Sequence, residues 1–110
     1  MIKAKIYRKD SKICGFEISG HAGYAPAGED IVCSAVTILS INTVNALEQF
    51  TELPFRAQAD EKKGGHLKVL IPLEGMADHD TQLLLETMVM GLSAIETEYK
   101  KYLTLMIEEV

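Results

Sequence analysis

Residues 20–50 read GHAGYAPAGEDIVCSAVTILSINTVNALEQF, and this stretch decides the fold. Its first ten residues hold four glycines or prolines, which predicts a loop. Asp30 follows directly before an apolar run, at the position that an N-cap residue occupies in a helix. The run extends to about Phe50, and Leu53-Pro54 ends it because a proline disfavours helical geometry in the residue before it. The stretch therefore predicts a long, mostly buried helix that begins beside a loop.

Alternating patterns on both sides of this helix predict two β-hairpins. Residues 2–7 and 14–19 alternate apolar with polar side chains, which is typical of half-buried strands. Residues 55–60 and 66–71 show the same alternation on either side of a turn at 61–65. The two strands of each pair are close enough in sequence to form an antiparallel hairpin.

A second helix is expected to start near Asp78 or Asp80. Apolar residues then recur at spacings of three and four as far as Tyr102, with charged residues on the other face. The pattern also allows a short terminal strand over residues 104–109. The order ββαββα, with or without that strand, predicts an α+β fold of two layers, in which two helices cover an antiparallel sheet built from two hairpins. We expect residues 1–110 to form a single domain, since this length leaves no room for a second core.

The composition excludes several classes of protein. A net charge of −5 and a pI near 5.1 argue against direct nucleic-acid binding. Polar residues interrupt the apolar stretches, and the first residues lack the apolar core of a secretory signal, so we expect no membrane contact and a cytoplasmic location. Two cysteines are too few for a disulfide scaffold, and the spacing of cysteine and histidine indicates no metal site.

The first turn of the predicted helix has the parts of a cysteine acyl-transfer site. With Asp30 as N-cap, Cys33 occupies the third helical position, where unpaired N–H groups and a partial positive charge favour a thiolate. His21, brought close by the loop, can accept the thiol proton or form an ion pair with the thiolate. The backbone N–H groups of Cys33 and Ser34 can donate to an oxyanion.

The same residues also fit a purely structural interpretation. A lone cysteine on an apolar helix is usually a small buried hydrophobe, and a histidine at a strand end can simply bond to the backbone. The other cysteine, Cys14, alternates with Phe16 and Ile18 and is predicted to lie in the core. The residues by themselves leave both interpretations open for His21 and Cys33.

A longer motif resembles that of the ribosomal-processing cysteine proteases of bacteria, the Prp family. That family has Gly-His-Ala, a glycine-containing loop, and then Gly-x-Asp-Ile-Val-Cys followed by small residues. The matching residues here are Gly20, His21, Ala22, Gly28, Asp30, Ile31, Val32 and Cys33. The resemblance implies that Cys33 is the nucleophile and His21 its base. It also implies supporting roles for Asp30 and for the hydroxyl four residues after the cysteine, usually serine in the family and Thr37 here.

The roles of Asp30 and of the loop stay open at this point. Asp30 either caps the helix or orients His21 in the manner of a triad acid. Its negative charge opposes a thiolate, so Asp30 does not activate Cys33 electrostatically. We interpret the loop as a gate that orders over a substrate peptide, with a simple mobile connector as the alternative. The loop residues assigned to substrate contact are Ala22, Gly23, Tyr24 and Gly28; Tyr24 either stacks on a substrate side chain or covers the edge of the core.

The resemblance further implies a specific reaction. The substrate would be the N-terminal extension of bacterial large-subunit ribosomal protein twenty-seven, cleaved without a metal or organic cofactor by a homodimeric enzyme. An acidic chain suits such a basic substrate. The alternative is a non-catalytic module that binds ribosomal protein or ribosomal RNA, in which Cys33 is merely buried.

Overall fold

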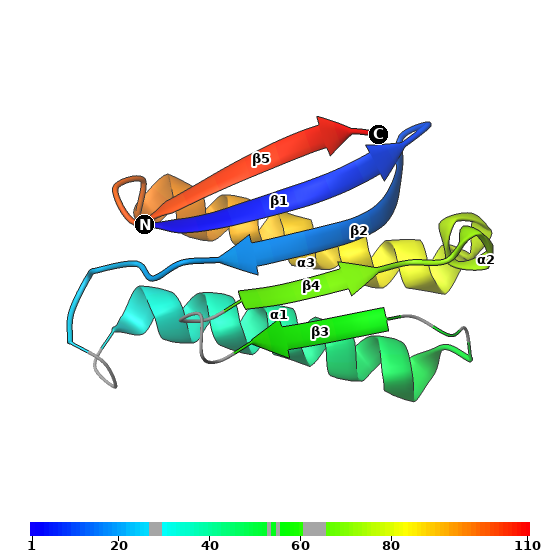
Figure 1. Cartoon of the computed structure of the whole chain (residues 1–110), viewed down its shortest axis with the longest axis horizontal. Coiled ribbons are helices and arrows are strands. Elements are labelled where there is room, and N and C mark those ends of the chain that lie inside the picture. Colours follow the sequence, from blue (N-terminus) through cyan, green and yellow to red (C-terminus); the bar gives the residue numbers. More distant parts are fainter. Residues whose placement is uncertain (27–29, 53, 55, 61–65) are drawn as a thin grey trace.

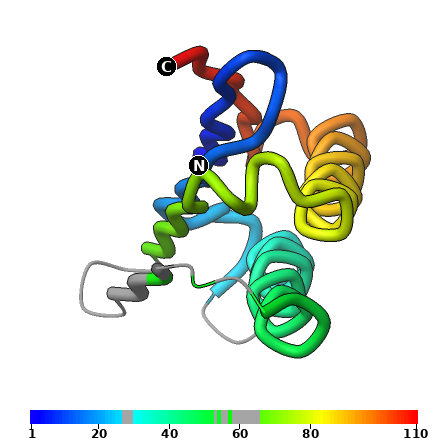
Figure 2. Tube along the Cα trace, turned by 90° about the vertical axis from the view of Figure 1, so that its right-hand side faces the viewer, coloured from blue at the N-terminus to red at the C-terminus, as the bar shows by residue number. Residues whose placement is uncertain are grey.

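The computed structural model describes all residues except 27–29, 53, 55 and 61–65. The elements in chain order are β1 (Ile2–Lys9), β2 (Lys12–Ser19), α1 (Ile31–Phe50), β3 (Arg56–Asp60), β4 (His66–Leu70), α2 (Leu73–Ala77), α3 (His79–Glu98) and β5 (Leu103–Glu109). In this part of the chain the strands form one sheet in the order β3-β4-β2-β1-β5. The long helices α1 and α3 lie side by side on one face of the sheet (Figure 1, Figure 2). The predicted two-layer α+β architecture is therefore confirmed.

Two elements differ from the prediction. β5 pairs with β1 in parallel, so the sheet is mixed rather than purely antiparallel. The physical reason is that α3 returns the chain along the sheet, so that β5 starts at the end where β1 starts (Figure 1). α2 stands where a polar loop was expected; it has five residues and no capping side chain, and the sequence therefore carries no signal for its start.

The core lies between the sheet and the two long helices. α1 turns a strip of valine and leucine side chains toward the sheet, and α3 does the same with leucine and methionine. The buried helical residues of this kind are Val32, Val36, Val44 and Leu47 on α1, and Leu85, Met88 and Leu92 on α3. α3 begins as predicted, because the Asp78 side chain accepts a hydrogen bond from the Thr81 N–H. It ends at Glu98, so Tyr102 of the predicted apolar stripe lies beyond the helix.

A β-bulge in β2 overturns the prediction for Cys14. Tyr7 of β1 pairs with Gly15, whereas its neighbour Arg8 pairs with Ile13, which leaves Cys14 as the extra residue. The bulge shifts the alternation by one residue, so Ile13 is fully buried and Cys14 is only half-buried. The backbone of Ile13 is satisfied by the buried side chain of Gln82, which accepts from the Ile13 N–H at 2.9 Å and donates to its carbonyl at 2.8 Å.

α1 is longer and more apolar than a surface helix requires. Among the described residues it is the one helix long and apolar enough to cross a membrane, with a mean hydropathy of 1.5 over its most apolar stretch. Of that stretch, 33% is buried inside the protein. The core helix of a layered protein meets the same criteria, and α1 packs Val36 and Leu47 into the core. The remainder of α1 presents an exposed apolar stripe, defined here as Ile31, Ile38 and Ile41.

The bulge predicts effects of very different size for two neighbouring substitutions. Ile13→Ala removes a fully buried side chain and should lower the free energy of unfolding by about 2–5 kcal/mol. Cys14→Ala should change it by less than about 1 kcal/mol, because Cys14 lies outside the core. Urea unfolding of both variants measures this difference. A larger loss for Cys14→Ala than for Ile13→Ala would contradict the observed register.

Candidate active site

The start of α1 is built around the Asp30 side chain. Asp30 has extended backbone angles, φ −82° and ψ 103°, and one of its carboxylate oxygens, Oδ1, accepts the N–H groups of Val32 and Cys33, both at 3.0 Å. This is the geometry of an N-cap. The cap places Cys33 in the first turn of α1, as predicted.

The other oxygen of Asp30 holds the loop that follows β2. Oδ2 accepts the N–H of Tyr24 at 3.0 Å, so one carboxylate joins the loop to the helix. Burial raises the pKa of Asp30, but hydrogen bonds from the Cys33 and Tyr24 backbones and from the Cys33 side chain outweigh it, and the pKa is lowered overall. Among the described residues, the His21 ring makes no hydrogen bond to Asp30. The structure therefore favours the capping role of Asp30 over the orienting role.

The Cys33 sulfur is half-buried and accepts a backbone hydrogen bond from the loop. The Ala22 N–H donates to Cys33 Sγ at 3.3 Å, and Ala22 itself is buried. A backbone N–H at this position is a donor from which a negatively charged sulfur could also accept. His21 directly precedes Ala22 and its side chain is exposed, so the fold brings the two proposed catalytic residues to the same end of the molecule.

The predicted oxyanion donors are not free. The Cys33 N–H is bonded to Asp30 Oδ1, and the Ser34 N–H donates to the Asp30 carbonyl at 3.0 Å. That part of the prediction is wrong, because the cap and the first helical turn use both groups. The Ser34 and Thr37 side chains are exposed on α1, and their supporting roles stay predictions. Gly28 lies outside the described residues.

Two glycines shape the path of the loop around His21. Gly20 has a φ of +90°, and a Cβ there would lie 2.5 Å from the Met1 carbonyl oxygen. Both the left-handed φ and this backbone contact exclude a side chain, which explains a glycine directly before His21. Gly23 also has a positive φ, +71°, and a Cβ there would meet open space.

Two tyrosines at this end of the molecule were not predicted as site residues. The ring of Tyr24 contacts those of Tyr99 and Tyr102 edge-on, with centroid distances of 5.9 and 5.2 Å. Figure 1 shows why, since the loop after β2 and the turn from α3 to β5 lie at the same end. In sequence these tyrosines only continue the apolar stripe of a helix. The contact supports the interpretation that Tyr24 covers the edge of the core.

The lowered pKa of Asp30 predicts a pH-dependent stability that Asp30→Asn removes. A carboxyl whose pKa is lower folded than unfolded stabilises the fold above the unfolded value, near 3.9, and loses this effect as the pH falls through the folded value. Wild type should therefore be more stable than Asp30→Asn at pH 6, and the difference should shrink below about pH 4. Urea unfolding at both pH values measures it.

Asp30→Ala serves as the control for this comparison. Asparagine keeps an oxygen for the cap but cannot accept from Cys33 and Tyr24 at once, whereas alanine loses both contacts. Glu17 and Asp78 also have a lowered pKa, but their contribution is common to all three proteins and cancels. An equal difference between wild type and Asp30→Asn at pH 6 and pH 3 would contradict the assignment.

Known cysteine proteases are similar to this chain in sequence. The family model described as cysteine protease Prp matches residues 1–104. The chain is 37% identical over 103 residues to the ribosomal processing cysteine protease Prp of Bacillus subtilis, which covers 91% of each chain.

Solved structures extend the likeness to the whole fold. The ribosomal processing protease Prp of Staphylococcus aureus, crystallised with a covalently linked product peptide, has a TM-score of 0.92 and 29% identity over 98% of this chain and 100% of that one. A Streptococcus mutans protein has a TM-score of 0.90 and 34% identity over 100% of this chain and 96% of that one. The chain therefore belongs to the Prp family of ribosomal processing cysteine proteases.

Proposed function

We propose that this chain removes the N-terminal extension of bacterial large-subunit ribosomal protein twenty-seven, with Cys33 as nucleophile and His21 as the residue that transfers protons. The observation that carries this proposal is the hydrogen bond from the Ala22 N–H to Cys33 Sγ, which ties the residue after His21 to a thiol at a helix start. The Staphylococcus aureus relative, with its covalently linked product peptide, supports covalent catalysis in this fold. Family membership favours a protease over the non-catalytic binding module.

The reaction follows from these positions. The Cys33 thiolate attacks the scissile carbonyl carbon, a carbon–sulfur bond forms, and the electron pair moves to the carbonyl oxygen. When the intermediate collapses, the carbon–nitrogen bond breaks and His21 gives its proton to the leaving amine. Water then attacks the thioester, His21 takes a proton from it, and Cys33 is released. Cys33 supplies the nucleophile for acylation, water supplies it for hydrolysis, and His21 carries the proton in both steps, so the proposed reaction requires no metal or organic cofactor.

Several neighbouring groups fit supporting roles. Thr37 lies one helical turn after Cys33, where positions four residues apart face the same side. We therefore expect its hydroxyl to lie on the side of α1 that carries Cys33. Ala22, whose N–H donates to the thiol, is followed by Gly23 and Tyr24, and we expect a substrate peptide to contact this segment of the loop. We place the reaction in the cytoplasm, where thiols stay reduced.

The proposed nucleophile and base can be tested directly with the extended ribosomal protein. Cys33→Ala should abolish release of the extension, and His21→Ala should slow it by about 10²–10⁴-fold. Cys14→Ala is the matched control and should cleave like wild type, since Cys14 lies in the β2 bulge. Mass spectrometry of the products measures the rates. Absence of cleavage by wild type, or equal cleavage by Cys33→Ala, would overturn the proposed function.

The exposed apolar stripe of α1 supports the homodimer that the family resemblance implies. Ile31, Ile38 and Ile41 recur at spacings of seven and three, so they share one helix face, turned away from the core. Exposed apolar patches of this kind mark interfaces. A second copy presents the same stripe, and a two-fold arrangement lets both copies cover each other. We therefore propose that α1 forms the dimer contact.

A single charge in the stripe should dissociate this dimer. Ile38→Glu places a carboxylate in the middle of the apolar contact, where its desolvation is costly. Leu73→Glu, on the exposed α2, is the matched control and should leave the dimer intact. Sedimentation velocity over a concentration series measures the association. A wild type that stays monomeric throughout, or equal dissociation of both variants, would contradict this interface.

A further inference from the structure

The three tyrosines at the site end form a contact that the catalytic proposal does not use. The Tyr24 ring stands nearly perpendicular to those of Tyr99 and Tyr102, at interplanar angles of 89° and 79°. Edge-to-face packing of this kind is attractive because the positive edge of one ring meets the negative face of another. Tyr99 and Tyr102 are also packed against the core. The loop after β2 is therefore held by aromatic contacts to residues from the far end of the chain.

The turn that carries Tyr99 and Tyr102 is anchored on three sides. The Tyr99 N–H donates to the Ile95 carbonyl of α3 at 2.8 Å, and the Tyr99 carbonyl accepts from Tyr102 at 2.9 Å and from Leu103 at 3.2 Å. The Tyr102 carbonyl accepts the N–H of Ile2, in β1, at 2.9 Å. A turn that is bonded to a helix and two strands offers the Tyr24 ring a fixed support.

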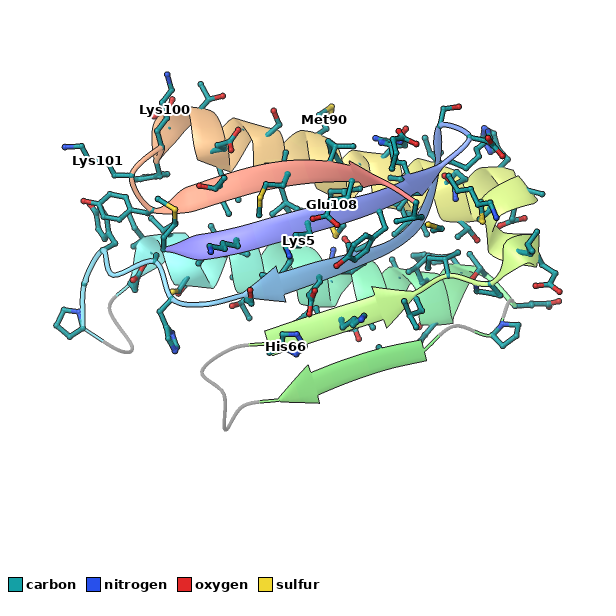
Figure 3. The ribbon with its side chains drawn as sticks, turned by 45° about the horizontal axis from the view of Figure 1, so that its top comes forward. Lys5, His66, Met90, Lys100, Lys101 and Glu108 are labelled. Atoms are coloured by element: carbon teal, nitrogen blue, oxygen red, sulfur yellow. The ribbon has the colours of Figure 1, made fainter. Side chains whose placement is uncertain are left out.

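Charged side chains of the same turn point the other way. Lys100 and Lys101 extend outward from the ribbon, away from the body of the molecule (Figure 3). Both are exposed, whereas Tyr99 and Tyr102 are half-buried. The turn therefore separates an inner aromatic side, which faces Tyr24, from an outer cationic side.

Two backbone hydrogen bonds of the loop connect Tyr24 with the Cys33 side of the site. The Tyr24 N–H is bonded to Asp30, and two residues earlier the Ala22 N–H is bonded to Cys33 Sγ. The position of this part of the loop therefore decides whether the Ala22 amide stays within hydrogen-bond distance of the Cys33 sulfur.

We propose that Tyr99 and Tyr102 are positioning residues for the nucleophile: they hold the Tyr24 ring and thereby keep the Ala22 N–H on Cys33 Sγ. This inference rests on the proposed role of Cys33. The tyrosines act through the loop, since their rings contact Tyr24. Loss of the rings should free the loop, weaken the Ala22 hydrogen bond and make the thiolate scarcer at neutral pH.

The experiment measures the reactivity of Cys33 rather than peptide cleavage. In a Cys14→Ala background only Cys33 reacts with iodoacetamide, and the rate as a function of pH reports its thiolate. Tyr99→Leu and Tyr102→Leu should move the midpoint of that profile to higher pH and slow alkylation about tenfold at pH 7, as expected for a lost hydrogen bond to a charged group. Tyr99→Phe and Tyr102→Phe keep the rings and should behave like the parent. Asp30, whose carboxylate accepts the Cys33 N–H, and His21, which directly precedes Ala22 in the chain, are unchanged in all variants.

Control variants separate positioning from general destabilisation. Tyr7→Leu removes a half-buried tyrosine of β1 whose hydroxyl donates to Glu17, and should lower the melting temperature without moving the alkylation midpoint. If the Tyr99 and Tyr102 variants fail to fold, Tyr24→Leu and Tyr24→Phe test the same contact from the loop side. An unchanged midpoint in the leucine variants, or an equal shift in the phenylalanine or Tyr7→Leu variants, would overturn the inference.

The alkylation experiment can fail or succeed independently of the proposed protease activity. Alkylation needs no substrate, so a shifted midpoint supports positioning even when the extended ribosomal protein is not cleaved. Cleavage without any shift in the leucine variants would leave the proposed function intact and overturn the positioning role.

Discussion

The carboxylate of Asp30 is the constraint on which the rest of the site depends. It accepts three backbone N–H groups, two from the first turn of α1 and one from Tyr24 in the loop. These donors explain how a charged group is tolerated in a buried position. A serine or asparagine has too few acceptor sites on one side chain to serve the helix and the loop together. The choice of aspartate therefore follows from the need to join two segments at one point.

The same carboxylate also fixes the two segments that meet at the Cys33 sulfur. It accepts the Cys33 N–H at the start of α1 and the Tyr24 N–H of the loop, two residues after the amide that donates to the sulfur. The start of α1 supplies a partial positive charge, and the Ala22 N–H supplies a direct hydrogen bond. Asp30 thus helps to hold both the start of α1 and the Ala22 amide beside the thiol. The site therefore depends on one buried carboxylate and on the backbone N–H groups that it holds in place.

Much of this arrangement could be predicted from local sequence, and the rest could not for identifiable reasons. The N-cap at Asp30 and the position of Cys33 follow from neighbouring residues, and the structure agrees. The Cys14 prediction was wrong because a bulge changes the alternation, and its stabilising partner Gln82 is far away in sequence. The parallel pairing of β5 depends on where α3 ends. The contact of Tyr24 with Tyr102 depends on that pairing in turn, so no local pattern indicates it.

The location of the site explains why its parts are joined by caps and aromatic contacts rather than by the core. It lies where β2 ends, α1 begins and α3 turns into β5, at one end of both layers (Figure 1). Element ends have fewer buried neighbours than element centres and open at lower free energy. The Cys33 thiol lies there and is only half-buried, so its surroundings need separate anchors. Asp30 and the three tyrosines supply them, and each anchor joins the loop to an element that the core already holds.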